Sequence, residues 1–236
     1  MQASCSDYSP PLKAGGVSAV SGKMPRMISN PFPAAEFDAW AESYDTSVSI
    51  NQFPFYGYQD LLSKTFSLAQ PHPGLSILDL GTGTGNLALP FARLGCSLWC
   101  TDFSEPMLAK ARQKIPSAHF SLHDLHNPLP ADLDHPFDRI VSAYVFHHFN
   151  LDEKIRILVH LLPYLVATGW IVLGDIAFPD TAALEKAKVD TGDGWEDEYY
   201  WILSESTPAL TRAGFRVEYL QVSSCAGVFT LYPCSK

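Results

Sequence analysis

An apolar run that ends in three closely spaced glycines is the feature that most constrains this chain. Residues 75–80 read as a buried strand, and Gly81, Gly83 and Gly85 follow it directly. Beyond them, apolar residues recur at helical spacing over residues 87–94. A strand that turns into a helix over glycines lets a ligand approach bare backbone. This stretch is therefore predicted to be a strand–turn–helix unit with a ligand site at its turn.

Two kinds of nucleoside-bearing ligand could use such a turn. The dinucleotide fingerprint G-x-G-x-x-G fails, because Asn86 stands where its third glycine would be. The pattern Asp-x-Gly-x-Gly-x-Gly that begins at Asp79 instead resembles motif I of the class I S-adenosylmethionine-dependent methyltransferases. That resemblance implies that Asp79 holds the ammonium of the methionine moiety and that Gly81 and Gly83 offer backbone contacts. It makes S-adenosylmethionine the expected cofactor.

Two further acids stand at the ends of the next two strand candidates, just as the glycine turn stands at the end of the first. Residues 97–101 read as a second strand that ends at Asp102, and residues 118–122 read as a third that is followed by Asp124. A carboxylate at the end of the second strand can accept both ribose hydroxyls. The resemblance implies that Asp124 accepts the adenine amino group; the alternative for it is an ordinary turn residue.

The predicted cofactor site includes several neighbours of these acids. Phe103 and Met107 are expected to pack on the adenine, with ordinary core packing as the alternative for Met107. The full predicted set is Tyr44, Asp79, Gly81, Thr82, Gly83, Gly85, Asp102, Phe103, Met107, Asp124, Leu125 and Ser142.

The composition excludes some classes of protein. A length of 236 residues with 47% hydrophobic residues suits one domain with a full core. A net charge of −9 and the lack of a Lys/Arg cluster disfavour nucleic acid as a substrate. The five scattered cysteines form no C-x-x-C pair and have no histidine at zinc-ligand spacing, so no metal site is predicted. Their odd number points to a reducing, cytoplasmic compartment, and the sequence has no bilayer-long apolar stretch and no signal-peptide pattern.

The rest of the chain is predicted to complete an alternating α/β fold. Residues 1–27 read as a flexible N-terminal extension and residues 28–236 as one domain that begins with a helical cap at 28–70. Phe37, Trp40, Ala41 and Tyr44 fall on one helical face. Further helices are expected at 56–67, 152–166, 181–188 and 204–212, and further strands at 137–143, 169–176, 217–222 and 227–232. The prediction is a Rossmann-like sheet of seven mostly parallel strands with helices on both faces and an antiparallel last strand.

The segment after the fourth strand carries the candidates for catalysis. His147 and His148 can supply a general base, and Tyr144 precedes them; backbone capping and packing are the alternative roles of the two histidines. An acidic and aromatic insert at 181–211 is expected near the substrate. Candidate substrate contacts are Asp175, Trp195, Tyr199 and Tyr200, which would suit a cationic or amine-bearing acceptor; a solvated acidic face with core aromatics is the alternative.

Three stretches are similar to the YrrT-type branch of the same methyltransferase superfamily, namely 37–45, 142–148 and 198–200. The resemblance implies a cytosolic enzyme that methylates a small molecule by in-line displacement, with Tyr44 near the cofactor. An RNA or tRNA methyltransferase and a non-catalytic cofactor-binding protein on the same fold remain as alternatives. A monomer or homodimer without a membrane partner is expected.

Overall fold

The computed structural model describes residues 34–133 and 135–234, so the extension predicted at 1–27 lies outside the described residues. Its strands are β1 Ser76–Leu80, β2 Ser97–Asp102, β3 His119–Leu122, β4 Phe137–Ala143, β5 Leu165–Phe178, β6 Trp201–Ile202, β7 Phe215–Gln221 and β8 Ala226–Pro233. Its α-helices are α1 Ala34–Trp40, α2 Tyr44–Ser47, α3 Tyr58–Leu68, α4 Ala88–Leu94, α5 Glu105–Lys114, α6 Leu151–Leu161, α7 Thr181–Thr191 and α8 Leu203–Arg212.

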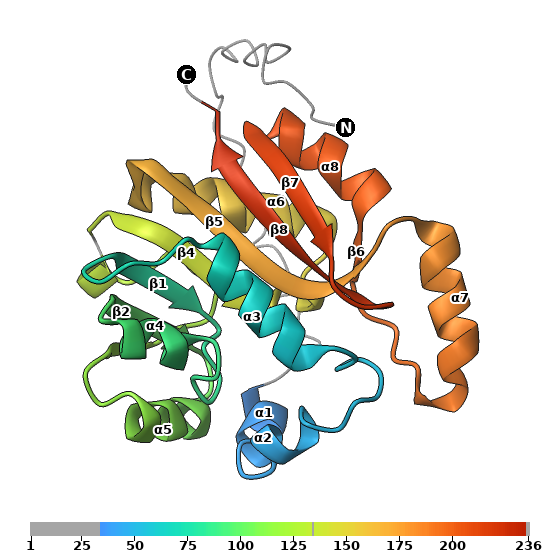
Figure 1. Cartoon of the computed structure of the whole chain (residues 1–236), viewed down its shortest axis with the longest axis horizontal. Coiled ribbons are helices and arrows are strands. Elements are labelled where there is room, and N and C mark those ends of the chain that lie inside the picture. The colour runs from blue at the N-terminus through green and yellow to red at the C-terminus, as the bar shows by residue number, and fades with distance from the viewer. Residues whose placement is uncertain (1–33, 134, 235–236) are drawn as a thin grey trace, which may run out of the picture.

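The strands form one sheet in the order β3-β2-β1-β4-β5-β8-β7, with the short β6 beside β5 (Figure 1). Strands β1 to β5 are parallel to their neighbours, and β8 runs antiparallel to both β5 and β7. This confirms the predicted Rossmann-like fold. The strand order reverses direction between β1 and β4, and ligands of open α/β sheets bind beside the carboxyl ends of the strands at such a point.

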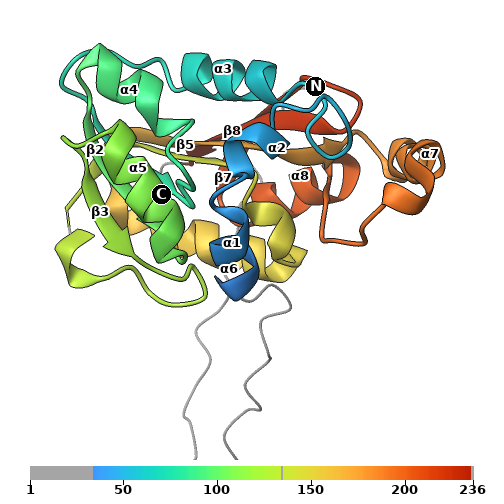
Figure 2. The same ribbon diagram turned by 90° about the horizontal axis from the view of Figure 1, so that it is seen from below.

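Alternating side chains divide the core between the two faces of the sheet. Ile77 of β1 packs on one face with Leu61 of α3 and Phe91 of α4. Leu78 packs on the other face with residues of α6 and α8, such as Leu158. Figure 2 shows α3 and α4 on one side of the sheet and α6 and α8 on the opposite side. Because both faces are covered, the central strands carry apolar side chains toward both faces, with a few polar residues such as Asp79 and Asp175 among them.

Three local predictions are corrected by the structure. The helical face at 37–45 is divided between α1 and α2, although Trp40 and Tyr44 still meet edge to face with their ring centroids 4.8 Å apart. Helix α6 ends at Leu161 rather than at 166, because a single 3-10 turn at Leu162–Tyr164 follows and β5 already begins at Leu165. Strand β6, within the predicted insert, was not predicted from the sequence.

Two smaller findings concern a buried thiol and membranes. Cys100 of β2 is a buried free thiol. None of the described helices combines the length and the apolar character needed to cross a bilayer.

Candidate active site

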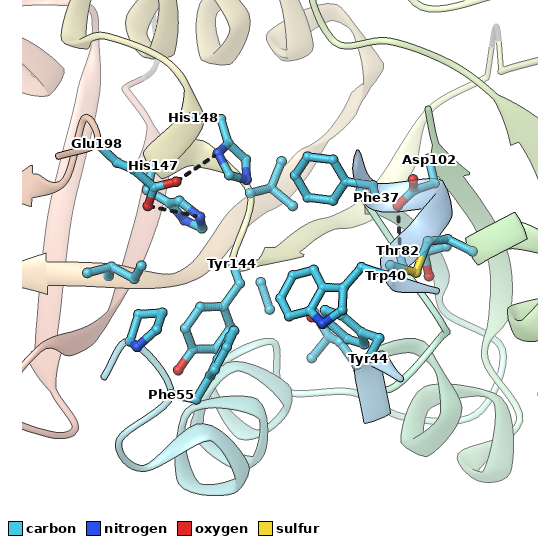
Figure 3. A pocket seen from close by; sticks show the side chains of 18 of the residues that line it. Phe37, Trp40, Tyr44, Phe55, Thr82, Asp102, Tyr144, His147, His148 and Glu198 are labelled. Atoms are coloured by element: carbon cyan, nitrogen blue, oxygen red, sulfur yellow. Dashed lines mark hydrogen bonds and ion pairs between the residues drawn. The ribbon is translucent and has the colours of Figure 1, made fainter. Parts of the chain in front are cut away.

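A cavity of about 600 Å³ lies where β1, β2 and β4 end, and α1, α2 and residues 52–58 cover it. Figure 3 shows its two ends: Thr82 and Asp102 lie at one, and His147, His148 and Glu198 lie at the other. Aromatic side chains occupy the space between the two ends. They include Trp40, Tyr44, Phe55 and Tyr144.

The glycine turn forms one wall of the cavity. Gly81 and Gly83 line it with φ values of +65° and +54°, a conformation that side chains other than glycine rarely adopt. A Cβ atom on Gly81 would lie 2.4 Å from a methyl carbon of Val145, whereas one on Gly83 would meet no atom within 4 Å. Gly85 does not line the cavity; a Cβ there would meet Ala111 of α5 instead, which points to a packing role.

Two buried carboxylates stand beside this turn without a cationic partner in the described chain. Thr82 Oγ1 donates to Asp79 at 2.6 Å, and burial raises the pKa of Asp79 to about 7. Asp102 accepts the backbone N–H groups of Gly83 at 2.8 Å and Ser104 at 2.9 Å, while burial raises its pKa to about 6. A buried anion without a partner is unfavourable, so this end of the cavity is suited to a ligand that brings positive charge and hydroxyl donors.

The side of the cavity next to α5 is apolar with one acid. Phe103, Met107 and Leu125 line it. Asp124 also lines it, and its Oδ1 accepts the backbone N–H of His126 at 2.9 Å. It therefore has the turn role that was the alternative, and its contact with the cofactor stays a prediction. Ser142 does not line the cavity, because its hydroxyl turns inward and donates to the carbonyl of Leu80 at 2.7 Å.

The short helix α2 is attached to the glycine turn through one carboxylate. Asp45 accepts Thr84 Oγ1 at 2.6 Å and Asn86 Nδ2 at 3.0 Å, and Lys114 Nζ lies 2.7 Å away. These contacts hold the partly buried Tyr44 over the cavity. They also explain Asn86, the residue that breaks the dinucleotide fingerprint: it joins the turn to the helical cap.

Tyr144 lies at the centre of the cavity, between its two ends (Figure 3). Its φ is +56°, which is unusual for a tyrosine, and its ring is stacked on that of Tyr58 with centroids 5.3 Å apart. Its hydroxyl is buried and has no hydrogen-bond partner among the residues that the structure describes. Because a buried hydroxyl is normally paired, this group is available to a ligand.

At the opposite end, His147 is held in place by a carboxylate behind it. Its Nδ1 lies 2.6 Å from Asp175 Oδ1, and Asp175 also accepts Trp201 Nε1 at 2.9 Å. Although burial acts in the other direction, the charge of Asp175 raises the pKa of His147 above its usual value. Glu198 faces both imidazoles, with an oxygen 3.8 Å from His147 Nε2 and the other 3.4 Å from His148 Nδ1. Asp175 thus orients His147 and leaves Nε2 facing Glu198, and both residues line the cavity.

Comparisons with known proteins identify the family. A sequence model described as a methyltransferase domain matches residues 77–169. An uncharacterized methyltransferase of Geobacillus sp. (strain WCH70) is 33% identical over 199 residues, which are 78% of this chain and 90% of the relative. The chain belongs to the methyltransferase family. The uncharacterized methyltransferase YrrT of Halobacillus halophilus is 28% identical over 202 residues, covering 80% of this chain and 92% of the relative.

Solved structures confirm the fold of this methyltransferase. A complex of DhpI with SAM and HEP superposes with a TM-score of 0.68 at 18% identity, over 84% of this chain and 95% of that one. The magnesium protoporphyrin IX methyltransferase of Synechocystis with bound SAH gives a TM-score of 0.62 at 21% identity, over 86% and 99% of the two chains. The class I family and its cofactor, S-adenosylmethionine, are those predicted from the sequence.

The structure brings most of the predicted site residues of this methyltransferase to one cavity. Tyr44, Asp79, Gly81, Thr82, Gly83, Asp102, Phe103, Met107, Asp124, Leu125, Tyr144, His147, His148 and Tyr200 all line it. Of the four predicted substrate contacts, only Tyr200 is among them. Asp175 lies behind His147, Trp195 stacks on the lining residue Phe53 at 4.8 Å, and the Tyr199 side chain is half exposed.

Several lining residues were not predicted. Phe37 and Trp40 line the cavity from α1. The sequence offered their shared helical face and the resemblance at 37–45 as signals, but neither was taken to indicate a site role. Glu198 entered the sequence analysis as one acid of the insert and as part of the resembling stretch 198–200, without a site role. Its position opposite the histidines depends on the irregular segment 194–200, whose path no sequence periodicity determines.

Proposed function

We propose that this methyltransferase transfers a methyl group to a small-molecule acceptor that binds between Tyr144 and the two histidines. One observation carries this proposal: a single cavity runs from the two carboxylates at the glycine turn, Asp79 and Asp102, to Tyr144 and the two histidines. None of the residues lining it is Lys or Arg. A polyanionic substrate would need such side chains to neutralise its phosphates, so the lining favours a small acceptor over RNA.

The residues at the glycine turn fit the cofactor. We assign Asp79 and the backbone of Gly81 and Gly83 to its amino-acid part, and Asp102 to its ribose hydroxyls. Asp124, Phe103, Met107 and Leu125 are assigned to the adenine. The two raised carboxylate pKa values support this assignment, because a cationic ligand would relieve the burial of charge that raises them. When bound, the cofactor supplies a methyl group that its sulfonium already activates.

The chain's own residues then align the acceptor and exclude water. The aromatic side chains of Trp40, Phe55 and Tyr144 cover the centre of the cavity, where an acceptor would meet the methyl group in line. The unpaired hydroxyl of Tyr144 is placed to donate to the acceptor. His147, oriented by Asp175, is placed to receive a proton at Nε2 from an acceptor that must lose one. The cytoplasmic location and the monomeric or homodimeric state stay as predictions from the sequence.

Calorimetry with the cofactor tests the assignment of the carboxylates. Asp102→Ala should bind S-adenosylmethionine at least about tenfold more weakly, because a hydrogen bond to a charged group contributes about 1.5–3 kcal/mol. Glu185→Gln, an exposed acid of α7 outside the cavity, is the matched control and should bind as the wild type does. Equal affinity of Asp102→Ala and wild type would contradict the ribose assignment.

Labelled cofactor tests the acceptor class. Cell extract incubated with the enzyme and radiolabelled S-adenosylmethionine is fractionated by product size. The proposal predicts label in the small-molecule fraction. Label in a ribonuclease-sensitive, large fraction would instead support the RNA alternative, and cofactor binding without any labelled product would support the non-catalytic one.

A further inference from the structure

We propose that His147, His148 and Glu198 form a binding site for a divalent transition-metal ion, with Zn²⁺ as the best-matched ion, at the acceptor end of the cavity. One ligand atom from each of the three side chains can be chosen so that all lie within 4.8 Å of one another. The three side chains are 8%, 18% and 11% exposed. The sequence analysis predicted no metal site from the spacing of the cysteines, which take no part here, and Glu198 is remote from the histidines along the chain.

The distances between these atoms are near those of a tetrahedral site. Metal–ligand distances of about 2.0–2.1 Å place neighbouring tetrahedral ligands about 3.3 Å apart. Glu198 Oε1 lies 3.4 Å from His148 Nδ1, and Glu198 Oε2 lies 3.8 Å from His147 Nε2. Glu198 faces the two imidazoles with different oxygens, and with one atom from each residue the three lie within 4.8 Å of one another. The widest separation must therefore close by up to about 1.5 Å to reach tetrahedral spacing. Two imidazoles and one carboxylate are a donor set of catalytic zinc sites, which keep one position open.

The residue behind the first ligand supports this assignment. A metal-binding histidine typically gives its other ring N–H to a carboxylate, which fixes its orientation and tautomer. Asp175 stands in that place, 2.6 Å from His147 Nδ1, and is itself held by Trp201 Nε1 at 2.9 Å. The backbone N–H of Tyr199 donates to the carbonyl of His147 at 2.9 Å and so anchors the segment that carries Glu198.

The open position of such an ion would face the cavity, which all three ligands line together with Tyr144. This part of the inference rests on the proposed function and names the acceptor class: a thiol or hydroxyl compound whose sulfur or oxygen is the fourth ligand. On coordination the acceptor loses its proton to water, so with the ion bound His147 acts as a ligand and no longer as the proton acceptor. A lone pair of its sulfur or oxygen then forms the bond to the methyl carbon, while the donor's carbon–sulfur bond breaks and its electron pair stays on sulfur.

Metal titration of the full-length protein tests the site without any turnover. After chelator treatment and dialysis, the protein is titrated with ZnCl₂ against a chromophoric chelator and, separately, with CoCl₂ under visible absorption. We expect one equivalent of metal and a tetrahedral Co²⁺ spectrum. Glu198→Gln and His148→Ala should each weaken Zn²⁺ binding at least about tenfold, since even residues behind metal ligands change affinity 10- to 100-fold.

The matched control is Glu196→Gln, an exposed acid two residues from the proposed ligand that also lines the cavity. It should bind Zn²⁺ with wild-type affinity. S-adenosylmethionine binding, measured on each variant, verifies that it is folded. Adding 2-mercaptoethanol to the Co²⁺ form should produce a thiolate-to-cobalt absorption band if the open position accepts a thiol.

Two results would overturn the inference. One is the absence of saturable metal binding by the wild type, and the other is equal Zn²⁺ affinity in wild type, Glu198→Gln and His148→Ala. These outcomes are separate from failure of the proposed function. Methyl transfer that persists unchanged after the metal is removed would refute the metal's role in acceptor binding and leave the proposed function standing. Specific metal binding without methyl transfer to any small molecule would refute the proposed function and leave the metal site standing.

Discussion

Replacing Asp79 by asparagine should stabilise the protein in the absence of cofactor while weakening cofactor binding. Burial raises the pKa of this carboxyl from 3.8 to about 7. Between these values the folded chain holds a proton that the unfolded chain has released, so stability falls as the pH rises through this window. At pH 8 the full difference of about 3 pKa units lowers the free energy of unfolding by about 4 kcal/mol. At pH 5 the same group lowers it by only about 1.5 kcal/mol.

The neutral amide of Asp79→Asn removes this pH-dependent term. Its oxygen can still accept from Thr82 Oγ1, as the carboxylate does at 2.6 Å. Any cost of burying the amide N–H groups is the same at both pH values. The change in relative stability between pH 5 and pH 8 therefore reports only the titration of the wild-type carboxyl. The stability of the variant relative to wild type should therefore be about 2.5 kcal/mol more favourable at pH 8 than at pH 5, which is about 5–10 °C in melting temperature for a chain of this size.

Urea denaturation and thermal melts without cofactor, at pH 5 and pH 8, measure this difference. Glu185→Gln, exposed on α7, is the control and should change stability by no more than about 0.5 kcal/mol at either pH. Calorimetry at pH 8 should show S-adenosylmethionine binding to Asp79→Asn about 10- to 100-fold more weakly, because a charged hydrogen-bond partner is lost. A variant whose relative stability is the same at both pH values would refute the reasoning.

Three other substitutions test the walls of the cavity. Gly83→Ala should lower the free energy of unfolding, measured in urea, by about 1 kcal/mol because of its positive φ. Gly81→Ala should lower it by about 1–3 kcal/mol more, because its Cβ would collide with Val145. Equal losses in the two variants would contradict this. Tyr144→Phe should leave stability within about 1 kcal/mol of wild type, since the hydroxyl has no partner in the described chain, yet lower turnover of the acceptor; an unchanged kcat/KM would argue against its role. Asp45→Asn should change stability by no more than about 1 kcal/mol, because the residue is exposed. It should speed cofactor dissociation in stopped-flow measurements, because Asp45 attaches α2 to the glycine turn. An unchanged off-rate would show that α2 does not retain the cofactor.

The cofactor end of the site could be predicted from the sequence because its residues follow strands in a regular way. Asp79 lies within the first strand, and Asp102 and Asp124 end or follow the next two; in a parallel sheet these carboxyl ends meet at one edge. The acceptor end was predicted only in part. Ile176 lines the cavity whereas its neighbour Asp175 does not, since successive side chains of a strand point to opposite faces. Because strand β5 is largely apolar on both faces, its sequence did not reveal which alternate set of its side chains faces the cavity.

The two ends of the cavity differ in how their charges are balanced, and this changes the interpretation of the acidic insert. At the glycine turn, Asp79 and Asp102 have no cation near them among residues 34–133 and 135–234, so a positively charged ligand is favoured there. At the other end, Asp175 and Glu198 already face two imidazoles. Asp197 of the insert is turned to the surface, where it pairs with Lys188 at 2.7 Å. The insert therefore adds little uncompensated negative charge at the acceptor, and selection there depends on coordination and shape more than on a cationic group.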